Sequence, residues 1–305
     1  MMRRALLFPG QASQEVGMAK DIYDEFPAVQ KLYRKAKDIL KYDLSEITFD
    51  GPIEKLTETK ITQPAIFVAS AAYFSVLPET YKFHTVAGHS LGEFSALFAS
   101  GVLSFEDALR IVKERAEGMQ EAGLQNPGTM AAILNLGREE LDKALDHANL
   151  RGIVNVANFN CPGQIVISGE VDAVRYAMEV CKRVGALKTI ELKVSGAFHS
   201  PLMSSAKAGL IKAIEKAKFN EATVPVYCNF TAKRTTNPKE ISGNLIQQLE
   251  NPVLWEDSIL SMVSDGIQEF VEVGPGKVLQ GLNRRIDRNA KTGGVNKIED
   301  LEALL

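Results

Sequence analysis

A serine between two glycines is the first feature of the sequence that could do chemistry. Gly88-His89-Ser90-Leu91-Gly92 fits the pattern G-x-S-x-G, with a short apolar run at 85–87 before it and helical periodicity at 93–100 after it. On a sharp turn from strand to helix, glycines allow close packing, the serine oxygen is exposed, and free backbone N–H groups can hold an oxyanion. A glycine-rich turn can match by chance, but the flanking strand and helix favour Ser90 as a nucleophile.

A serine nucleophile needs a general base, and the sequence offers four histidines. His84 lies just before the apolar run, and His89 adjoins Ser90 on a turn where neighbouring side chains point apart. His147 ends a short amphipathic segment and is typical of a solvated histidine near a helix C-terminus. His199 lies in a turn-rich segment, and elimination favours it as the base that takes the Ser90 proton.

The spacing of acidic residues leaves open which group orients His199. Asp257 and Glu272 are both candidates on spacing alone. The segment 195–201, which contains His199, follows a small domain that we predict below at 126–194, where the chain must re-enter a larger domain. A seam between two domains is a favoured place for a binding site.

An arginine lies on the apolar face of a helix predicted over 104–122, which begins with a capping-box pattern at Ser104. The apolar stripe of this helix consists of Ala108, Val112 and Met119. Arg115 fills the gap in that stripe, at successive spacings of four, three and four residues. Such an arginine can extend along the edge of the stripe into solvent. Alternatively it faces a pocket, where a guanidinium would bind a substrate carboxylate through two hydrogen bonds.

The elements that must position these residues follow two patterns. Short apolar runs at 5–8, 85–87 and 269–273 predict buried parallel strands, each closed by glycine. In the middle of the chain the expected order is strand, helix, strand, strand, helix, strand, at 129–134, 139–147, 153–157, 164–168, 171–184 and 187–192. That order is the ferredoxin-like pattern. The sequence therefore predicts a large α/β domain at 1–125 and 195–305 with a small domain inserted at 126–194.

The composition is that of an ordinary globular protein, with 305 residues, 45% hydrophobic and 24% charged. A formal net charge of -3 argues against nucleic acid or an anionic membrane as the main partner. The three cysteines lack a CxxC spacing, so neither a disulfide framework nor a zinc site is expected. The first apolar run stops at Pro9 and Gly10, and the stretch 65–77 is too short to span a bilayer. We expect a cytoplasmic protein without a targeting segment.

Across almost its whole length the chain resembles malonyl-CoA:acyl carrier protein transacylases, including the acyltransferase domains of fatty acid and polyketide synthases. Each motif that carries the resemblance is short, but their joint order is specific. They lie at 8–11, 62–65, 88–92, Arg115 with 119–122, 158–160, 162–164, 167–169, 196–200, 248–249, 252–255 and 272–276. The resemblance implies a hydrolase-like α/β domain with a ferredoxin-like insert, in agreement with the pattern of elements.

The resemblance also implies roles for individual residues. Ser90 and His199 would form the catalytic dyad, and the backbone carbonyl of Gln248 would orient His199 in place of an acidic side chain. The backbone N–H groups of Gln11 and Leu91 would form the oxyanion hole. These roles suit acyl transfer from a thioester, which is already activated and needs no metal or redox cofactor.

Substrate selection is implied for three further positions. Arg115 would bind the malonyl carboxylate, and Asn160 would lie near the active site. Phe198 would favour malonyl over branched extenders, because polyketide acyltransferases that take malonyl carry Phe just before the catalytic histidine. One departure is visible, since many members have Gly where this chain has Ala12. That departure matters only if position 12 requires a positive φ.

We therefore expect an enzyme that moves malonyl from malonyl-CoA to the phosphopantetheine thiol of acyl carrier protein through a malonyl-serine intermediate. A serine esterase or thioesterase is the first alternative, because the same elbow serves hydrolysis. The same transferase with a different extender acyl group is another. A catalytically silent module that only docks acyl carrier protein is a third, and the joint presence of Ser90, His199 and Arg115 argues against it.

Overall fold

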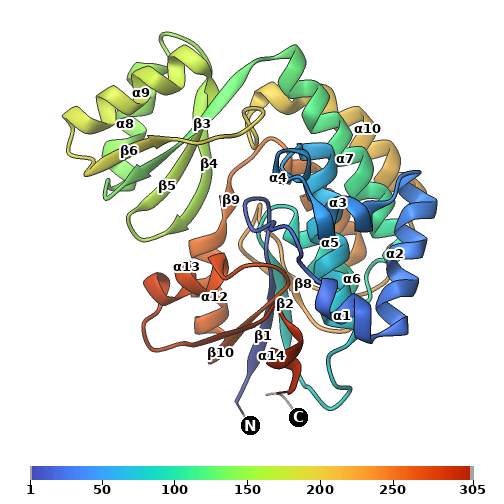
Figure 1. The fold of residues 1–305 in the computed structure, drawn as a ribbon. Coiled ribbons are helices and arrows are strands. Elements are labelled where there is room, and N and C mark those ends of the chain that lie inside the picture. Colours follow the sequence, from blue (N-terminus) through green and yellow to red (C-terminus); the bar gives the residue numbers. More distant parts are fainter. Residues whose placement is uncertain (1, 303–305) are drawn as a thin grey trace.

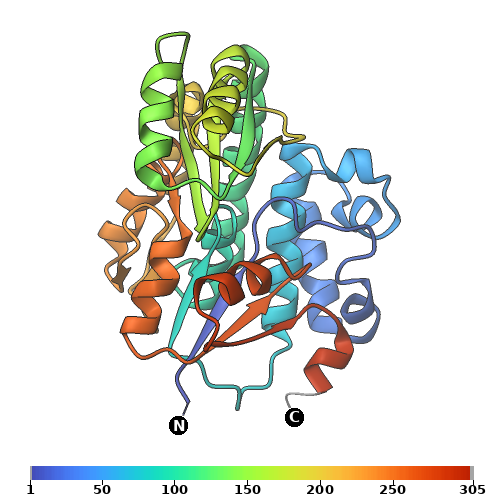
Figure 2. The ribbon, with the colours of Figure 1, turned by 90° about the vertical axis from the view of Figure 1, so that its left-hand side faces the viewer.

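The computed structural model describes residues 2–302, whose strands form two sheets. The larger sheet has six strands in the order β11-β10-β1-β2-β7-β8, and only the β7–β8 pair is antiparallel. Its strands are β1 (Arg4–Phe8), β2 (Thr85–Gly88), β7 (Val226–Tyr227), β8 (Arg234–Thr235), β10 (Glu269–Val273) and β11 (Lys291–Val295). The smaller sheet stands over one end of the larger one in both ribbon views (Figures 1 and 2).

Helices cover the large sheet on both faces, which explains why its central strands are continuous apolar runs. Leu6 and Phe8 of β1 pack with α5 and α6, whereas Ala5 and Leu7 on the opposite face pack with α12 and α13. The helices of this lobe are α1 (Lys20–Glu25), α2 (Pro27–Leu40), α3 (Leu44–Asp50), α4 (Ile53–Leu56), α5 (Thr59–Ser75), α6 (Gly92–Ala99), α7 (Phe105–Gln125), α10 (Ser204–Lys216), α11 (Pro238–Gln248), α12 (Trp255–Ser264), α13 (Val278–Ile286) and α14 (Ile298–Glu302), with a 3-10 turn, η1, at Pro201–Met203.

The small sheet has the strand order β6-β3-β5-β4-β9. Its strands are β3 (Gly128–Leu134), β4 (Val154–Cys161), β5 (Gln164–Glu170), β6 (Lys188–Glu191) and β9 (Val253–Leu254). The helices α8 (Arg138–Ala148) and α9 (Val171–Arg183) share a separate apolar core with this sheet. The fifth strand, β9, pairs in parallel with β4 and comes from outside the predicted segment 126–194.

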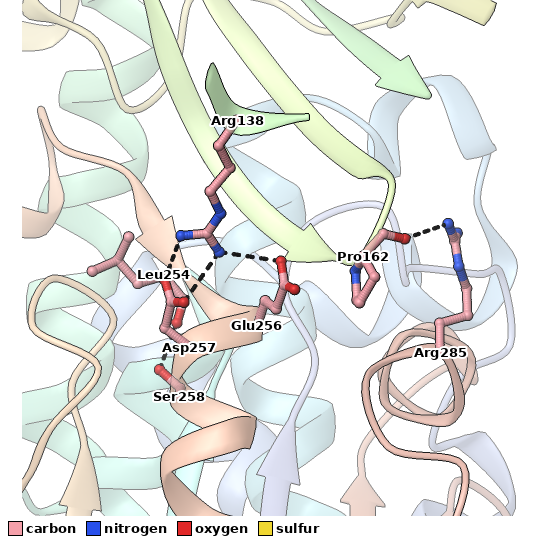
Figure 3. A network of polar contacts seen from close by, with 7 residues as sticks. All are labelled: Arg138, Pro162, Leu254, Glu256, Asp257, Ser258 and Arg285. Carbon is pink, nitrogen blue, oxygen red and sulfur yellow. Dashed lines mark hydrogen bonds and ion pairs between the residues drawn. The ribbon is translucent and has the colours of Figure 1, made fainter. Parts of the chain in front are cut away.

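Two arginines tie the lobes together on the side of α12 and α13 (Figure 3). Arg138, at the start of α8, forms ion pairs with Glu256 and Asp257 of α12. Arg285 of α13 donates to the backbone carbonyl of Pro162 in the β4–β5 turn, over 3.1 Å. The small lobe is therefore held against the large one next to the seam in which His199 lies.

The predicted elements are present with small shifts of their ends. The largest shift is in β4, which continues past 157 to Cys161 because its pairing with β5 resumes after a register shift. The strands β7, β8, β9 and β11 were not predicted, since two-residue strands have no period and β11 carries two glycines. Among residues 2–302, no helix is long and apolar enough to cross a membrane.

Candidate active site

The serine elbow joins the end of β2 to the start of α6. Ser90 has φ 51°, a left-handed conformation that non-glycine residues rarely adopt. A Cβ at Gly88 would overlap the backbone of Gly92, and a Cβ at Gly92 would overlap the carbonyl oxygen of Phe8. The glycines of the motif are therefore needed for close packing of the turn against β1, which leaves Ser90 half-buried at the helix N-terminus, where it lines the cavity described below.

Ser90 and His199 lie within hydrogen-bond distance across the seam. Oγ of Ser90 is 2.8 Å from Nε2 of His199, and Nδ1 of His199 is 2.8 Å from the backbone oxygen of Gln248. A carbonyl oxygen only accepts, so Nδ1 carries the proton and Nε2 is free to accept the serine proton. Burial, followed by the charge of Arg115, lowers the pKa of His199 to about 3. The imidazole is therefore neutral at physiological pH, as a general base must be.

Neither acidic candidate for orienting His199 is correct. Asp257 is engaged by Arg138 on the outside of α12. Glu272 accepts hydrogen bonds from the backbone N–H groups of Leu279 and Gln280 at the start of α13. Spacing suggested these carboxylates because they are the usual partners of a catalytic histidine, whereas the partner here is a backbone carbonyl.

Arg115 points into the site from α7, with only 1% of its surface exposed. Its Nη2 donates to Oγ of Ser90 and to Oε1 of Gln248, over 3.0 Å each, and Nη1 donates to Oε1 of Gln63 over 2.6 Å. Burial lowers its pKa to about 10, so the guanidinium stays charged at neutral pH. Its hydrogen-bond partners among the described residues are neutral, and the carboxyl of Glu93 favours its charge without forming an ion pair with it, so the buried cation has no carboxylate in direct contact.

A cavity of about 270 Å³ opens in front of these groups. It is lined by the dyad and by Gln11, Asn160 and Phe198, and the apolar side chains of Met130, Val166 and Leu192 form the wall on the small lobe. A larger hollow of about 590 Å³ lies between α2, α7 and α10, but its lining contains neither Ser90 nor His199. The smaller cavity is the one that combines a nucleophile, a base and an anion-binding group.

Two backbone N–H groups beside Ser90 are free to act on a substrate. Within residues 2–302, those of Gln11 and Leu91 have no acceptor, and both residues line the cavity. The Ser90 N–H, in contrast, donates to Oδ1 of Asn229 over 2.6 Å. Ala12 has φ 81°, so its departure from glycine does matter, because a Cβ is strained in that conformation.

Of the remaining candidate residues, Asn160 and His89 lie in the cavity wall, whereas His84 and His147 do not line it. Oδ1 of Asn160 lies 2.8 Å from Nε2 of His89, whose ring packs on Trp255. His89 is therefore a structural partner of Asn160, as expected from its place on the turn. His84 accepts from the backbone N–H of Arg4, at the other end of β2. The side chain of His147 lies in the last turn of α8, away from the cavity.

Three residues to which the sequence analysis gave no role complete the site, and of these only Gln63 lies within one of the motifs, at 62–65. Gln63 of α5 holds Arg115, Asn229 follows β7, and Glu93 of α6 accepts from Gln248 through Oε2 over 2.8 Å. Burial raises the pKa of Glu93 to about 7. Glu93 could have been found from the sequence, because it is the one acidic residue in the mostly apolar helix α6. No sequence pattern indicated Asn229.

Comparison with known proteins gives a consistent result. Residues 5–298 match the acyl transferase domain family. A Bacillus subtilis protein named malonyl CoA-acyl carrier protein transacylase is 43% identical over 306 residues, covering 99% of this chain and 96% of that protein. An Escherichia coli K12 protein of the same name is 41% identical over 307 residues, covering 100% of this chain and 99% of that protein.

Solved structures agree with this match. The crystal structure of an acyl carrier protein S-malonyltransferase from Vibrio cholerae has a TM-score of 0.95 at 39% identity, covering 99% of this chain and 100% of that one. A malonyl-transacylase in complex with its type II polyketide acyl-carrier protein also has a TM-score of 0.95, at 38% identity, with 99% of both chains covered. The mixed α/β architecture with two sheets is therefore shared with these proteins.

Proposed function

This chain belongs to the acyl transferase domain family, and we propose that it transfers malonyl from malonyl-CoA to the phosphopantetheine thiol of an acyl carrier protein. The observation that carries this proposal is the buried guanidinium of Arg115 beside the pair of Ser90 and His199. A nucleophile alone would suit many acyl groups, whereas a buried cation without an anionic partner favours an acyl group with a free carboxylate.

In the first half-reaction, Ser90 gives its proton to Nε2 of His199 as Oγ attacks the thioester carbon. The developing oxyanion would accept hydrogen bonds from the N–H groups of Gln11 and Leu91. The carbon–sulfur bond then breaks, and His199 returns the proton to the departing sulfur. Coenzyme A leaves, and a malonyl ester remains on Ser90.

In the second half-reaction, the thiol of the carrier protein replaces coenzyme A. His199 takes the thiol proton, the sulfur attacks the ester carbon, and the carbon–oxygen bond to Ser90 breaks with return of the proton to Oγ. The backbone oxygen of Gln248 keeps the same tautomer of His199 in both halves. No metal or redox cofactor takes part, because the thioester already supplies an activated acyl group.

Residues of both lobes line the cavity, so different parts of the substrate would contact different lobes. The malonyl carboxylate would lie against Arg115, with Gln63 holding the guanidinium from behind. Asn160 and Phe198 would border the acyl group, and the apolar wall of the small lobe would border the arm that carries the thioester. The strand order β6-β3-β5-β4 supports a ferredoxin-like insert at 126–194 in a hydrolase-like domain at 1–125 and 195–305. We assign the enzyme to the cytoplasm, with neither nucleic acid nor membrane as a partner.

Intact-protein mass spectrometry after brief exposure to a panel of acyl-CoAs tests the proposal. We expect a malonyl adduct that maps to Ser90, appears faster than acetyl or methylmalonyl adducts, and disappears when acyl carrier protein is added. Double-reciprocal plots at several carrier concentrations should be parallel, as in a ping-pong mechanism. Release of free malonate at the rate of adduct loss would instead indicate a thioesterase, and absence of any adduct would indicate a docking module.

A further inference from the structure

The left-handed backbone of Ser90 must be held in place by its surroundings, because such a conformation persists in a non-glycine residue only when neighbours over-determine it. Asn229 makes the contacts that do so. It lies just beyond β7, which pairs with β2 through Val86–Val226 and Ala87–Tyr227, so the two chain segments leave the sheet side by side. Only 1% of its surface is exposed.

The side-chain amide of Asn229 spans the elbow from one side to the other. Oδ1 accepts from the N–H of Ser90 over 2.6 Å, and Nδ2 donates to the carbonyl oxygen of Gly88 over 2.7 Å. The backbone of Asn229 is itself fixed, since its N–H donates to Oε2 of Glu93 and its oxygen accepts from Leu254. All four polar groups of Asn229 are therefore used, and two of them bind the turn that carries the nucleophile.

The hydrogen bond from Ser90 N–H to Asn229 also determines which backbone N–H groups near the nucleophile remain free for a substrate. Because the Ser90 N–H is occupied by Asn229, it cannot bind an oxyanion, and the neighbouring N–H of Leu91 is left for that purpose. On the opposite side of the turn, Nε2 of Gln248 donates to the Ser90 carbonyl oxygen over 3.0 Å and to Glu93. The N–H and carbonyl groups of Ser90 are thus bound by the side-chain amides of Asn229 and Gln248. Oε2 of Glu93 supports both residues, because it accepts from the backbone N–H of Asn229 and from Nε2 of Gln248.

We propose that Asn229 is a positioning residue of the acyl transfer reaction, holding Ser90 so that Oγ faces His199 and the Leu91 N–H faces the oxyanion. This inference rests on the proposed function. Asn229 touches neither substrate nor the reacting oxygen, and it acts only through the Ser90 backbone. Its removal should therefore slow acylation with little effect on binding of malonyl-CoA.

The first test compares Asn229→Ala with Asn283→Ala. Asn283 is an equally buried asparagine, which accepts from Trp255 and has no hydrogen bond to Ser90, His199 or Arg115. Rapid-quench mass spectrometry gives the rate constant of Ser90 acylation by malonyl-CoA and its dependence on concentration. We expect Asn229→Ala to lower the maximal rate constant about 10²-fold at nearly unchanged half-saturation, as for a small displacement of a reacting group. Asn283→Ala should lose stability but keep the rate constant of its folded fraction.

The second test uses Asn229→Asp and pH. A neutral carboxylic acid can accept from Ser90 and donate to Gly88, as the amide does, whereas a carboxylate cannot donate and repels the Gly88 oxygen. The acylation rate of this variant, divided by the wild-type rate at each pH to correct for titration of His199, should rise as pH falls and the new carboxyl becomes protonated. The charged group that contacts Asn229 is Glu93, and its proximity favours the neutral form.

The outcomes separate this inference from the proposed function. If wild-type protein forms no malonyl adduct, the proposed function fails. If wild type is acylated and the Asn229 variants react at its rate at every pH, the positioning role is overturned. The role is also overturned if both Asn229 variants fail to fold while Asn283→Ala folds, because Asn229 would then act on folding alone.

Discussion

Arg115 and Ser90 are in direct contact, with Nη2 of the guanidinium 3.0 Å from the serine oxygen. The arginine therefore touches the nucleophile as well as facing the cavity. The same nitrogen donates to Gln248, whose backbone oxygen orients His199. A change at Arg115 is consequently expected to alter both the choice of acyl group and the environment of the reacting oxygen.

Replacing Arg115 should change which acyl group is transferred. Arg115→Ala should lower kcat/KM for malonyl-CoA at least about 10- to 150-fold, because a charge-assisted hydrogen bond contributes about 1.5–3 kcal/mol. The kcat/KM for acetyl-CoA should fall less in Arg115→Ala, because an acetyl group has no carboxylate to pair with the guanidinium. Arg115→Lys should retain only part of the wild-type malonyl transfer, since an ammonium keeps the charge but not the planar pair of donors. The free energy of unfolding of Arg115→Ala should fall little or rise, because a buried cation that is present for substrate binding contributes little to the stability of the fold. Equal losses for malonyl-CoA and acetyl-CoA would mean that Arg115 is structural.

Ser90 and His199 should behave as one unit. Ser90→Ala and His199→Ala should each remove most turnover, and the double variant should be little slower than either, because the serine oxygen is of little use without its base. Steady-state kcat of the three variants checks this. If the two losses multiply, the residues act independently and the dyad is assigned wrongly.

Phe198 should limit the size of the acyl group at its α-carbon. Its ring lines the cavity beside His199 and is almost fully buried. Phe198→Ser should raise the ratio of methylmalonyl to malonyl transfer, by an amount consistent with about 1–3 kcal/mol for one methyl group. Measuring the ratio with both substrates on the same preparation removes any effect of partial unfolding. An unchanged ratio would exclude the ring as the selective group.

Ala12 should be a point of backbone strain that glycine relieves. At φ 81° the Cβ is unfavourable, and the side chain is exposed. Ala12→Gly should raise the free energy of unfolding by about 0.5–1 kcal/mol, the strain relieved exceeding the added entropy of the unfolded chain. Ala208→Gly, an exposed position inside α10, is the matched control and should lower stability by about 1 kcal/mol. Chemical denaturation of both variants checks the opposite signs.

Acid should destabilise the protein partly through His199. Its pKa is lowered by burial and by Arg115 from 6.5 to about 3, so between these values the unfolded chain binds a proton that the folded chain refuses. This contribution to stability is present above pH 6.5 and declines below it, by up to about 1.4 kcal/mol per pH unit. His199→Ala should therefore lose less stability between pH 6.5 and pH 4 than wild type does.

Glu93 opposes this effect, because its raised pKa makes the folded chain hold a proton between 4.5 and about 7. Its stability contribution is present below pH 4.5 and is lost as pH rises through about 7. Glu93→Gln should remove that compensation and make the acid decline steeper than in wild type. Denaturant titrations across this pH range would contradict the assignment if all three proteins declined in parallel.

The sequence by itself determined those features that depend on a few neighbouring residues. The elbow at Ser90 is encoded by a strand, two glycines and a helix within about a dozen positions. The inward direction of Arg115 follows from the period of its helix, and its 1% exposure confirms that direction. Local geometry decides both, because backbone dihedrals and side-chain direction are set by near neighbours in the chain.

Only the tertiary structure decided which distant groups meet. Ser90 and His199 are 109 residues apart, and His199 and Gln248 are 49 apart, so their contacts depend on how β2, α11 and the small lobe pack. Asn229 reaches the elbow because β7 pairs with β2. The strand β7 has only two residues, which is too short for a hydrophobic alternation that would predict it from the sequence. The orienting carbonyl of Gln248 has no side-chain signature at all, since every residue carries one. For that reason the sequence indicated the nucleophile, whereas folding determined the groups that hold it.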